Sequence, residues 1–174
     1  MDAGRCKAIG LSNCNSEQIE RIVQSARIKP ANLQIELHAY FQQKPLREVC
    51  KKHGISVCAY SPLGSKGRVQ AYKKSGLQFV NSFRVLIEVI INHLVIVYRP
   101  PEVPEVLDDE LVLKIAKTHA KTPAQIVLRH LVQHNIVVIP KSVSKKRIEE
   151  NSNVNTNRHE SIKELMISKT NVTF

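Results

Sequence analysis

The sequence predicts an α/β fold built around a parallel sheet, on three observations. Short apolar runs alternate along the chain with amphipathic stretches of helical period, as in successive βα units. Capping and helix-breaking residues separate these stretches. The chain has 174 residues, of which 43% are hydrophobic, so it is long and apolar enough to bury the core of one such domain.

Four short apolar runs are the predicted strands. They are Lys7–Leu11, Leu33–Glu36, Ile55–Tyr60 and Ile136–Ile139. Runs of this length, bounded by polar residues, Gly or Pro, are typical of strands in a buried parallel sheet. Four strands with their helices amount to half of an eight-stranded αβ barrel.

The first predicted helices follow the first two strands. One opens at Asn15 with Gln18 three residues on, as in a capping box, and its apolar face carries Ile19, Ile22, Val23 and Ala26. The next starts near Pro45 and ends at Gly54, and its predicted buried stripe is Leu46, Val49, Cys50 and His53.

Three further helices are expected near the end of the chain. The first carries an apolar face of Leu111, Val112, Ile115 and Ala116. Another opens at Thr122, with Pro123 at the first helical position and Gln125 at the third, a strong start signal. The last begins near Ser144.

Composition argues against several classes of protein. The net charge of +11 comes from scattered basic residues, and aromatic residues make up only 5%, so a nucleic-acid-binding surface is not expected. The four cysteines form no CxxC pair, which argues against a disulfide scaffold or a metal site. The first ten residues lack the apolar run of a signal peptide. We therefore expect a cytoplasmic protein with reduced thiols.

Residues 66–107 do not fit the alternating pattern. Within them Val85–Tyr98 is almost continuously apolar and β-branched. A membrane span needs about 20 apolar residues, whereas this run is shorter and contains Glu88 and Asn92. We therefore expect an irregular apolar insert with a Pro-rich linker and no membrane association. The predicted division is 1–65 for three strands with their helices, 66–107 for the insert, 108–157 for the last helices and strand, and 158–174 for a divergent tail.

Polar and aromatic residues follow each predicted strand, where parallel αβ barrels bind ligands. Ser12, Asn13 and Gln34 offer amides and hydroxyls that suit a carboxamide. Tyr60 offers a flat face for an aromatic ring.

Phosphate-binding features follow the third and fourth strands. Small residues in Ser61–Ser65 let the backbone approach a phosphate closely. Lys141 and Ser142 precede a helix start, which favours an anion, and Arg147 adds a charged donor. Taken singly, each of these residues could be a loop, core or surface residue, but their common position after strands favours a ligand site.

Five strings of this sequence together closely resemble the aldo-keto reductase family. They are KAIGLSNCN from Lys7, LQIELHAY from Leu33, HGISVCAYSPLGS from His53, TPAQIVLRH from Thr122 and IVVIPKSVSKKRIEEN from Ile136. The resemblance implies an NADPH-dependent carbonyl reductase with a TIM-type (β/α)8 barrel. It covers about four βα units, which match the fifth to eighth units of the family barrel.

The resemblance also implies roles for individual residues. Ser12, Asn13 and Gln34 match the carboxamide contacts, and Tyr60 matches the residue stacked on the nicotinamide ring. The pyrophosphate loop is matched by Ser61, Leu63 and Ser65. The pocket for the 2′-phosphate is matched by Lys141, Ser142, Val143 and Arg147, and the adenine contacts by Glu150 and Asn151.

The family's catalytic residues have no match in this sequence. They belong to the first half of the family barrel, and His38 matches a family histidine outside the catalytic set. We therefore expect a truncated oxidoreductase that binds NADPH and is inactive alone, with a small carbonyl substrate only if another chain supplies the catalytic half. The alternative is a non-catalytic half-barrel that binds a nucleotide or a protein partner. Open barrel edges also predict self-association.

Overall fold

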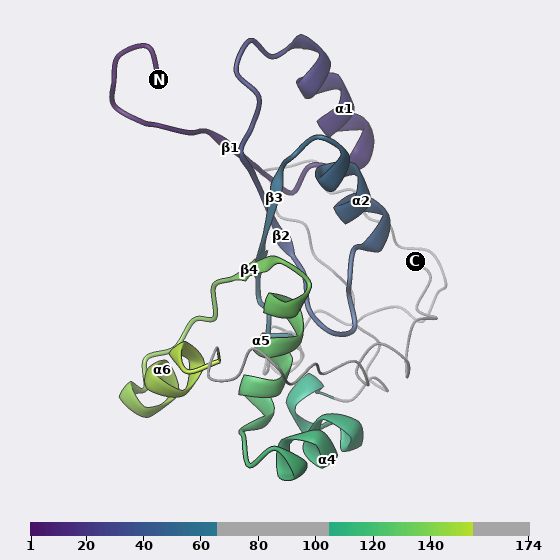
Figure 1. Ribbon diagram of the computed structural model, residues 1–174, viewed down its shortest axis with the longest axis vertical. Helices are drawn as coiled ribbons and strands as arrows, with labels where there is room; N and C mark the ends of the chain where they lie inside the picture. The colour runs from purple at the N-terminus through teal and green to yellow at the C-terminus, as the bar shows by residue number, and fades with distance from the viewer. Residues whose placement is uncertain (66–104, 155–174) are drawn as a thin grey trace, which may run out of the picture.

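The structure, a computed structural model, describes residues 1–65 and 105–154. These residues contain one four-stranded, wholly parallel sheet in the order β1-β2-β3-β4 (Figure 1). Its strands are β1 (Gly10–Ser12), β2 (Asn32–Glu36), β3 (Ser56–Tyr60) and β4 (Ile136–Val138). The predicted α/β fold with a parallel sheet is confirmed.

Helices connect and cover these strands. They are α1 (Ser16–Ser25), α2 (Lys44–Lys52), the short 3-10 helix η1 (Val106–Asp108), α4 (Glu110–Thr118), α5 (Pro123–Gln133) and α6 (Lys145–Ser152). Each of the five α-helices predicted from the sequence is present.

The helix starts follow the predicted capping signals. The side-chain oxygen of Asn15 accepts from the backbone N–H of Gln18 at 2.8 Å, and the Gln18 side chain accepts from the N–H of Asn15 at 2.9 Å. Thr122 and Gln125 make the same reciprocal pair at the start of α5, at 3.2 and 3.0 Å. Both capping boxes satisfy N–H groups that would otherwise lack a partner in the first helical turn.

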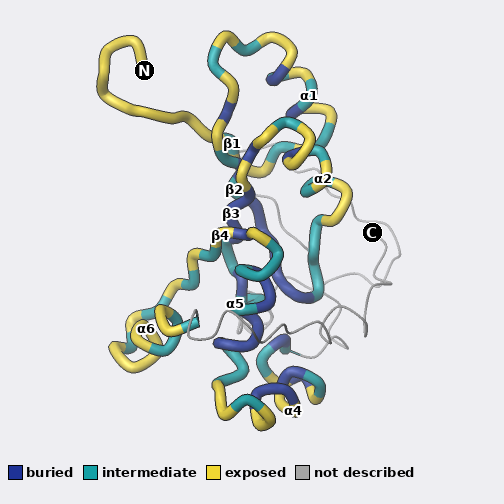
Figure 2. The backbone as a smooth tube through the Cα atoms, in the orientation of Figure 1, coloured by how far each residue is buried: buried dark blue, intermediate teal, exposed yellow. Residues whose placement is uncertain are grey.

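One face of the sheet packs against α1, α2 and α5. The core there contains alternate residues of the strands, such as Leu33, Ile35 and Val57, together with Ile19 of α1 and Leu131 of α5. Because side chains alternate across a strand, the remaining strand residues lie on the opposite face. In Figure 2 the buried part of the chain runs through β2, β3 and α5.

A second apolar cluster joins η1, α4 and α5. Val106 is completely buried, and it packs with Val112, Ile115 and Val127. The insert predicted from the sequence, residues 66–107, includes Val106 and Leu107. In the structure both residues lie in η1, where the side chain of Val106 packs against α4 and α5.

The strand boundaries differ from the sequence prediction at both edges of the sheet. β1 covers Gly10–Ser12, whereas Lys7–Leu11 was predicted. Gly10 lies opposite Asn32, the first residue of β2, so no strand of the described residues lies beside Lys7 and Ala8, and both are exposed. β4 ends one residue early, at Val138.

The apolar run Val85–Tyr98 lies outside the described residues, as do residues 158–174 of the predicted tail. Within residues 1–65 and 105–154, no helix combines the length and the apolar character needed to cross a membrane.

Candidate functional site

Hydrogen bonds join three predicted ligand residues at the carboxyl edge of the sheet. The hydroxyl of Tyr60, at the end of β3, donates to the side-chain oxygen of Asn13 at 3.0 Å. The backbone N–H of Asn13 donates to the carbonyl oxygen of Gln34 in β2 at 3.0 Å. Asn13 adopts a left-handed conformation with φ of 55°, which asparagine tolerates better than most residues. The ends of β1, β2 and β3 are therefore held together.

The strand register places the predicted carboxamide contacts on one face of the sheet. Ser12 pairs with Gln34, and Gln34 pairs with Cys58. Glu36, two residues beyond Gln34, pairs with Tyr60. Because paired residues and every second residue share a face, Ser12, Gln34 and Tyr60 lie on the face opposite the helix-packed core.

Ser61–Ser65 forms a tight loop directly after β3. Ser61, Gly64 and Ser65 all have positive φ values, of 51°, 79° and 53°. The N–H of Gly64 donates to the carbonyl oxygen of Ser61 at 2.9 Å. Left-handed residues in a turn direct backbone N–H groups to one side, an arrangement that suits an anion. Leu63 is half-buried against the second apolar cluster, so its backbone, rather than its side chain, is suited to a ligand.

The fourth predicted group begins where β4 ends beside β3. The N–H of Ile139 donates to the carbonyl oxygen of Ala59 at 3.2 Å, so the chain leaves the sheet next to the Tyr60 loop. Lys141 and Val143 follow and are exposed. The Ser142 hydroxyl accepts from the N–H of Ser144 at 3.2 Å. Ser142 therefore shapes the turn into α6.

The start of α6 carries uncompensated positive charge. Ser144 caps the helix by accepting from the N–H of Arg147 at 3.5 Å. Lys141 and Arg147 are exposed, and neither makes an ion pair with another described residue. The helix N-terminus adds a partial positive charge. These groups together favour an anion such as a phosphate.

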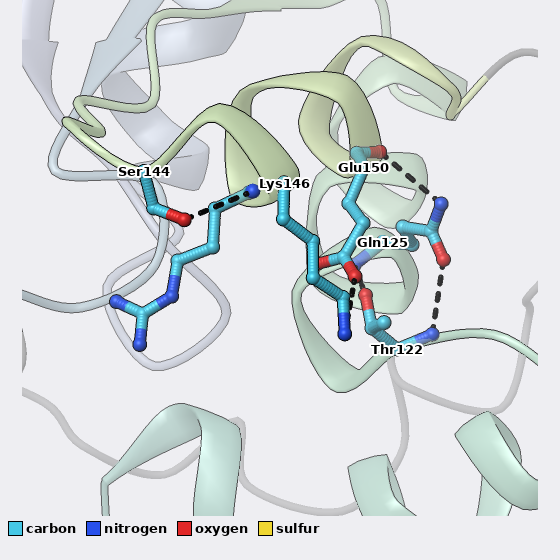
Figure 3. A network of polar contacts seen from close by, with 6 residues as sticks. Thr122, Gln125, Ser144, Lys146 and Glu150 are labelled. Carbon is cyan, nitrogen blue, oxygen red and sulfur yellow. Dashed lines mark hydrogen bonds and ion pairs between the residues drawn. The ribbon is translucent and has the colours of Figure 1, made fainter.

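Gln125 holds α6 against α5, whereas the sequence predicts only its role at the start of a helix. Its side-chain amide donates to the carbonyl oxygens of Glu150 at 3.1 Å and Asn153 at 3.4 Å, as Figure 3 shows for Glu150. The predicted adenine contacts Glu150 and Asn151 are half-buried in the last turns of α6. Gln125 is itself buried, and a glutamine at the third position of a helix is ordinarily explained by the capping box alone.

Two further polar pairs lie near the same edge of the sheet. The imidazole of His38 lies 3.9 Å from the carboxylate of Glu36, and both side chains are buried. The hydroxyl of Tyr40 donates to the carboxylate of Asp109, which also caps α4. The sequence did not indicate this second pair, because its partners are 69 residues apart.

The thiol of Cys58 lies on the same face as Gln34. Burial raises its pKa, as it raises the pKa of the Cys50 thiol, so both remain protonated and poorly nucleophilic at neutral pH. No group of three or more His, Cys, Asp or Glu residues within the described segments could hold a metal ion.

The predicted residues thus form two groups. Hydrogen bonds or strand pairing link Ser12, Asn13, Gln34 and Tyr60, and the Ser61–Ser65 loop continues from them. The second group, from Lys141 to Asn151, surrounds α6. The Ile139–Ala59 hydrogen bond places the start of the second group beside the first.

The chain is similar to known proteins over most of its length. Aldo-keto reductase family 1 member A1 of Cricetulus griseus is 38% identical over 151 residues, covering 87% of this chain and 38% of that protein. The aldose reductase of Schistosoma japonicum superposes with a TM-score of 0.68 at 38% identity, covering 95% of this chain and 41% of that one. The structure of a Gox0644 mutant in complex with NADPH superposes with a TM-score of 0.63 at 38% identity, covering 88% of this chain and 42% of that one.

The chain therefore spans less than half the length of these relatives. Residues 1–167 match the sequence model described as the Aldo/keto reductase family. With the parallel α/β fold and structural neighbours from the same family, this match shows that the chain belongs to the aldo/keto reductase family.

Proposed function

We propose that this chain is the NADPH-binding part of an aldo/keto reductase and that it does not reduce carbonyls alone. It would correspond to the fifth to eighth βα units of the barrel, with residues 1–65 and 108–157 holding the cofactor. The single observation that carries the proposal is the hydrogen-bonded set of Tyr60, Asn13 and Gln34 at the carboxyl edge of the sheet.

The chemistry of this set fits a nicotinamide. The ring of Tyr60 is half-buried, so part of its surface is accessible for stacking. Ser12 and Asn13 are exposed beside it, and a carboxamide needs both donors and acceptors of the kind that they and Gln34 provide.

The cationic start of α6 favours NADPH over NADH. NADPH differs by a phosphate on its adenosine ribose, and Lys141 and Arg147 are exposed cations without an ion-pair partner among the described residues. Arg offers a planar fork of donors that matches a phosphate. Since one structural neighbour is a complex with NADPH, the same cofactor is a consistent assignment for this chain.

Carbonyl reduction also needs an acid near the developing alkoxide, and NADPH supplies only the hydride. Among the residues described, the hydroxyl of Tyr60 already donates to Asn13, and Glu36 and His38 are buried against one another. None of these is presented as a proton donor to a small carbonyl substrate. We therefore propose that the described residues supply no such acid and that another chain supplies it. We also propose, separately, that the protein is cytoplasmic.

A paired measurement tests this function. NADPH and NADH are titrated against the purified chain by cofactor fluorescence, and oxidation of NADPH is followed with a simple aromatic aldehyde. We expect binding that prefers NADPH, without turnover. Turnover would contradict the absence of an acid in this chain, whereas a failure to bind either cofactor would contradict the proposed cofactor site.

A further inference from the structure

Both outer strands of the sheet have backbone groups that face away from their neighbours. The N–H of Asn13 bonds to Gln34 in β2, and the N–H of Ile139 bonds to Ala59 in β3. Because N–H groups alternate in direction along a strand, those of Ser12 and Val138 point to the outer sides of β1 and β4, where no strand of the described residues lies. Such edges are templates for pairing with another chain.

The β4 edge is also apolar and exposed. Val137 is 52% exposed and Ile139 is 45% exposed, and both lie on the sheet face opposite the helix-packed core, because Val137 pairs with Cys58. Large aliphatic side chains at an open strand edge are unusual, since edges are normally protected by charge or by a covering element. The position therefore indicates a protein partner.

No strand of the described residues pairs with the outer side of β1, the opposite edge of the sheet. Residues 1–10 are all exposed, and the chain extends away from β1 rather than along it (Figures 1 and 2). The outer strands β1 and β4 run in the same direction, because all three strand pairs within the sheet are parallel.

We propose that two copies of this chain associate edge to edge, with β4 of each copy paired in parallel to β1 of the other. The four strands that residues 1–65 and 105–154 contribute in each copy then give an eight-stranded closed sheet, a number for which side chains alone fill the interior. The two pairings are related by a two-fold axis and leave no open edge, so association stops at the dimer. Val137 and Ile139 become buried inside the closed sheet.

The net charge of the chain determines how dimerisation depends on salt concentration. Each copy carries a net charge of +11, so two copies repel one another, and salt screens that repulsion. Dimerisation is therefore stronger at about 0.5 M salt than at about 0.05 M. This dependence is opposite to that of an interface held by ion pairs.

Sedimentation over a range of protein concentrations tests the proposal, with Val137→Lys/Ile139→Lys as the interface variant. A buried, unpaired ammonium disfavours the dimer, so we expect its dissociation constant to rise about tenfold or more. Leu113→Lys/Ile148→Lys is the matched control, because it adds the same two charges at side chains that are 45% and 51% exposed but lie on α4 and α6. Circular dichroism of both variants reports whether each remains folded.

Hydrogen exchange identifies the surfaces without any substitution. The amides of Ser12 and Val138 should become protected together as the concentration of the unmodified chain rises. A monomer at every concentration and salt, protection of only one edge, or equal weakening by Leu113→Lys/Ile148→Lys would each overturn the proposal. A ladder of species beyond the dimer would overturn its two-fold closure.

Discussion

The hydroxyl of Tyr60 donates a hydrogen bond to the side-chain oxygen of Asn13 across 47 residues of sequence. This bond ties the loop after β1 to the end of β3, while the backbone of Asn13 is tied to β2. Three strand ends are therefore held in a fixed relation. A site built from several strand ends depends on such restraints, because each loop alone could adopt many conformations.

Substitutions of Tyr60 separate its ring from its hydroxyl. Tyr60→Phe keeps the stacking surface and removes only the hydrogen bond to Asn13, so we expect its affinity for NADPH to fall less than that of Tyr60→Ala. Tyr60→Ala removes the ring and should weaken NADPH about three- to tenfold, the usual value of an aromatic pair. Fluorescence titration measures both variants. Equal losses in the two would show that the hydroxyl, rather than the ring, contacts the cofactor.

Lys141 and Arg147 should determine the preference between the two cofactors. Removing a charged partner of a phosphate costs about 1.5–3 kcal/mol, so Lys141→Ala or Arg147→Ala should weaken NADPH about ten- to a hundredfold. NADH lacks the 2′-phosphate, so the affinity for NADH should change little. Lys114→Ala on α4 is the control, because Lys114 is exposed but lies on another helix. An equal effect on NADPH and NADH would contradict the assignment.

We expect Glu20 to make the packing of α1 on α2 sensitive to acid. Its carboxylate accepts from His53 at 2.9 Å and from Lys52 at 3.0 Å, and these hydrogen bonds, first that of His53, lower its pKa from 4.5. A lowered pKa means that the stabilisation is present above 4.5 and is lost as the pH falls through the folded-state value.

Glu20→Gln should therefore lower the unfolding midpoint at pH 7, and the difference from the unmodified chain should vanish in acid below that lowered pKa. Urea denaturation at a series of pH values measures the difference in unfolding midpoint between the variant and the unmodified chain. Glu149→Gln is the comparison, since that side chain is exposed on α6. A difference that persists unchanged at low pH would mean that the loss is not electrostatic.

Gln125→Ala should loosen α6 and with it the predicted phosphate site. The substitution leaves the carbonyl oxygens of Glu150 and Asn153 without their donor. We expect a loss of about 1 kcal/mol in unfolding free energy and faster hydrogen exchange in α6. Affinity for NADPH should also fall, because Arg147 lies on that helix. The control Gln24→Ala, on the exposed side of α1, should leave the unfolding free energy, the hydrogen exchange of α6 and the affinity for NADPH unchanged.

Local signals in the sequence were sufficient to predict the main elements. The capping boxes at Asn15 and Thr122 and the apolar run of β3 depend on neighbouring residues, so they are visible without the fold. Strand ends were predicted less well. The start of β1 depends on where β2 begins to pair with it, and no local pattern contains that information.

Long-range polar contacts were the main omission. Gln125 with Glu150, Tyr40 with Asp109 and Glu20 with His53 are separated by 25, 69 and 33 residues. No residue alone indicates its partner, whether it is predicted as a cap, as a surface group or, like His53, as part of a buried stripe, so only the packing of helices reveals each pair. The candidate site was predicted because its residues follow successive strands, and parallel strands bring such residues to one edge.

Hydrogen exchange with and without NADPH tests the central claim most directly. If the strand ends form one cofactor site, NADPH should slow exchange together in residues 10–15, 59–65 and 139–151, while α4 is unaffected. Protection confined to one of these segments, or its absence in all of them at saturating NADPH, would contradict a shared site on this edge of the sheet.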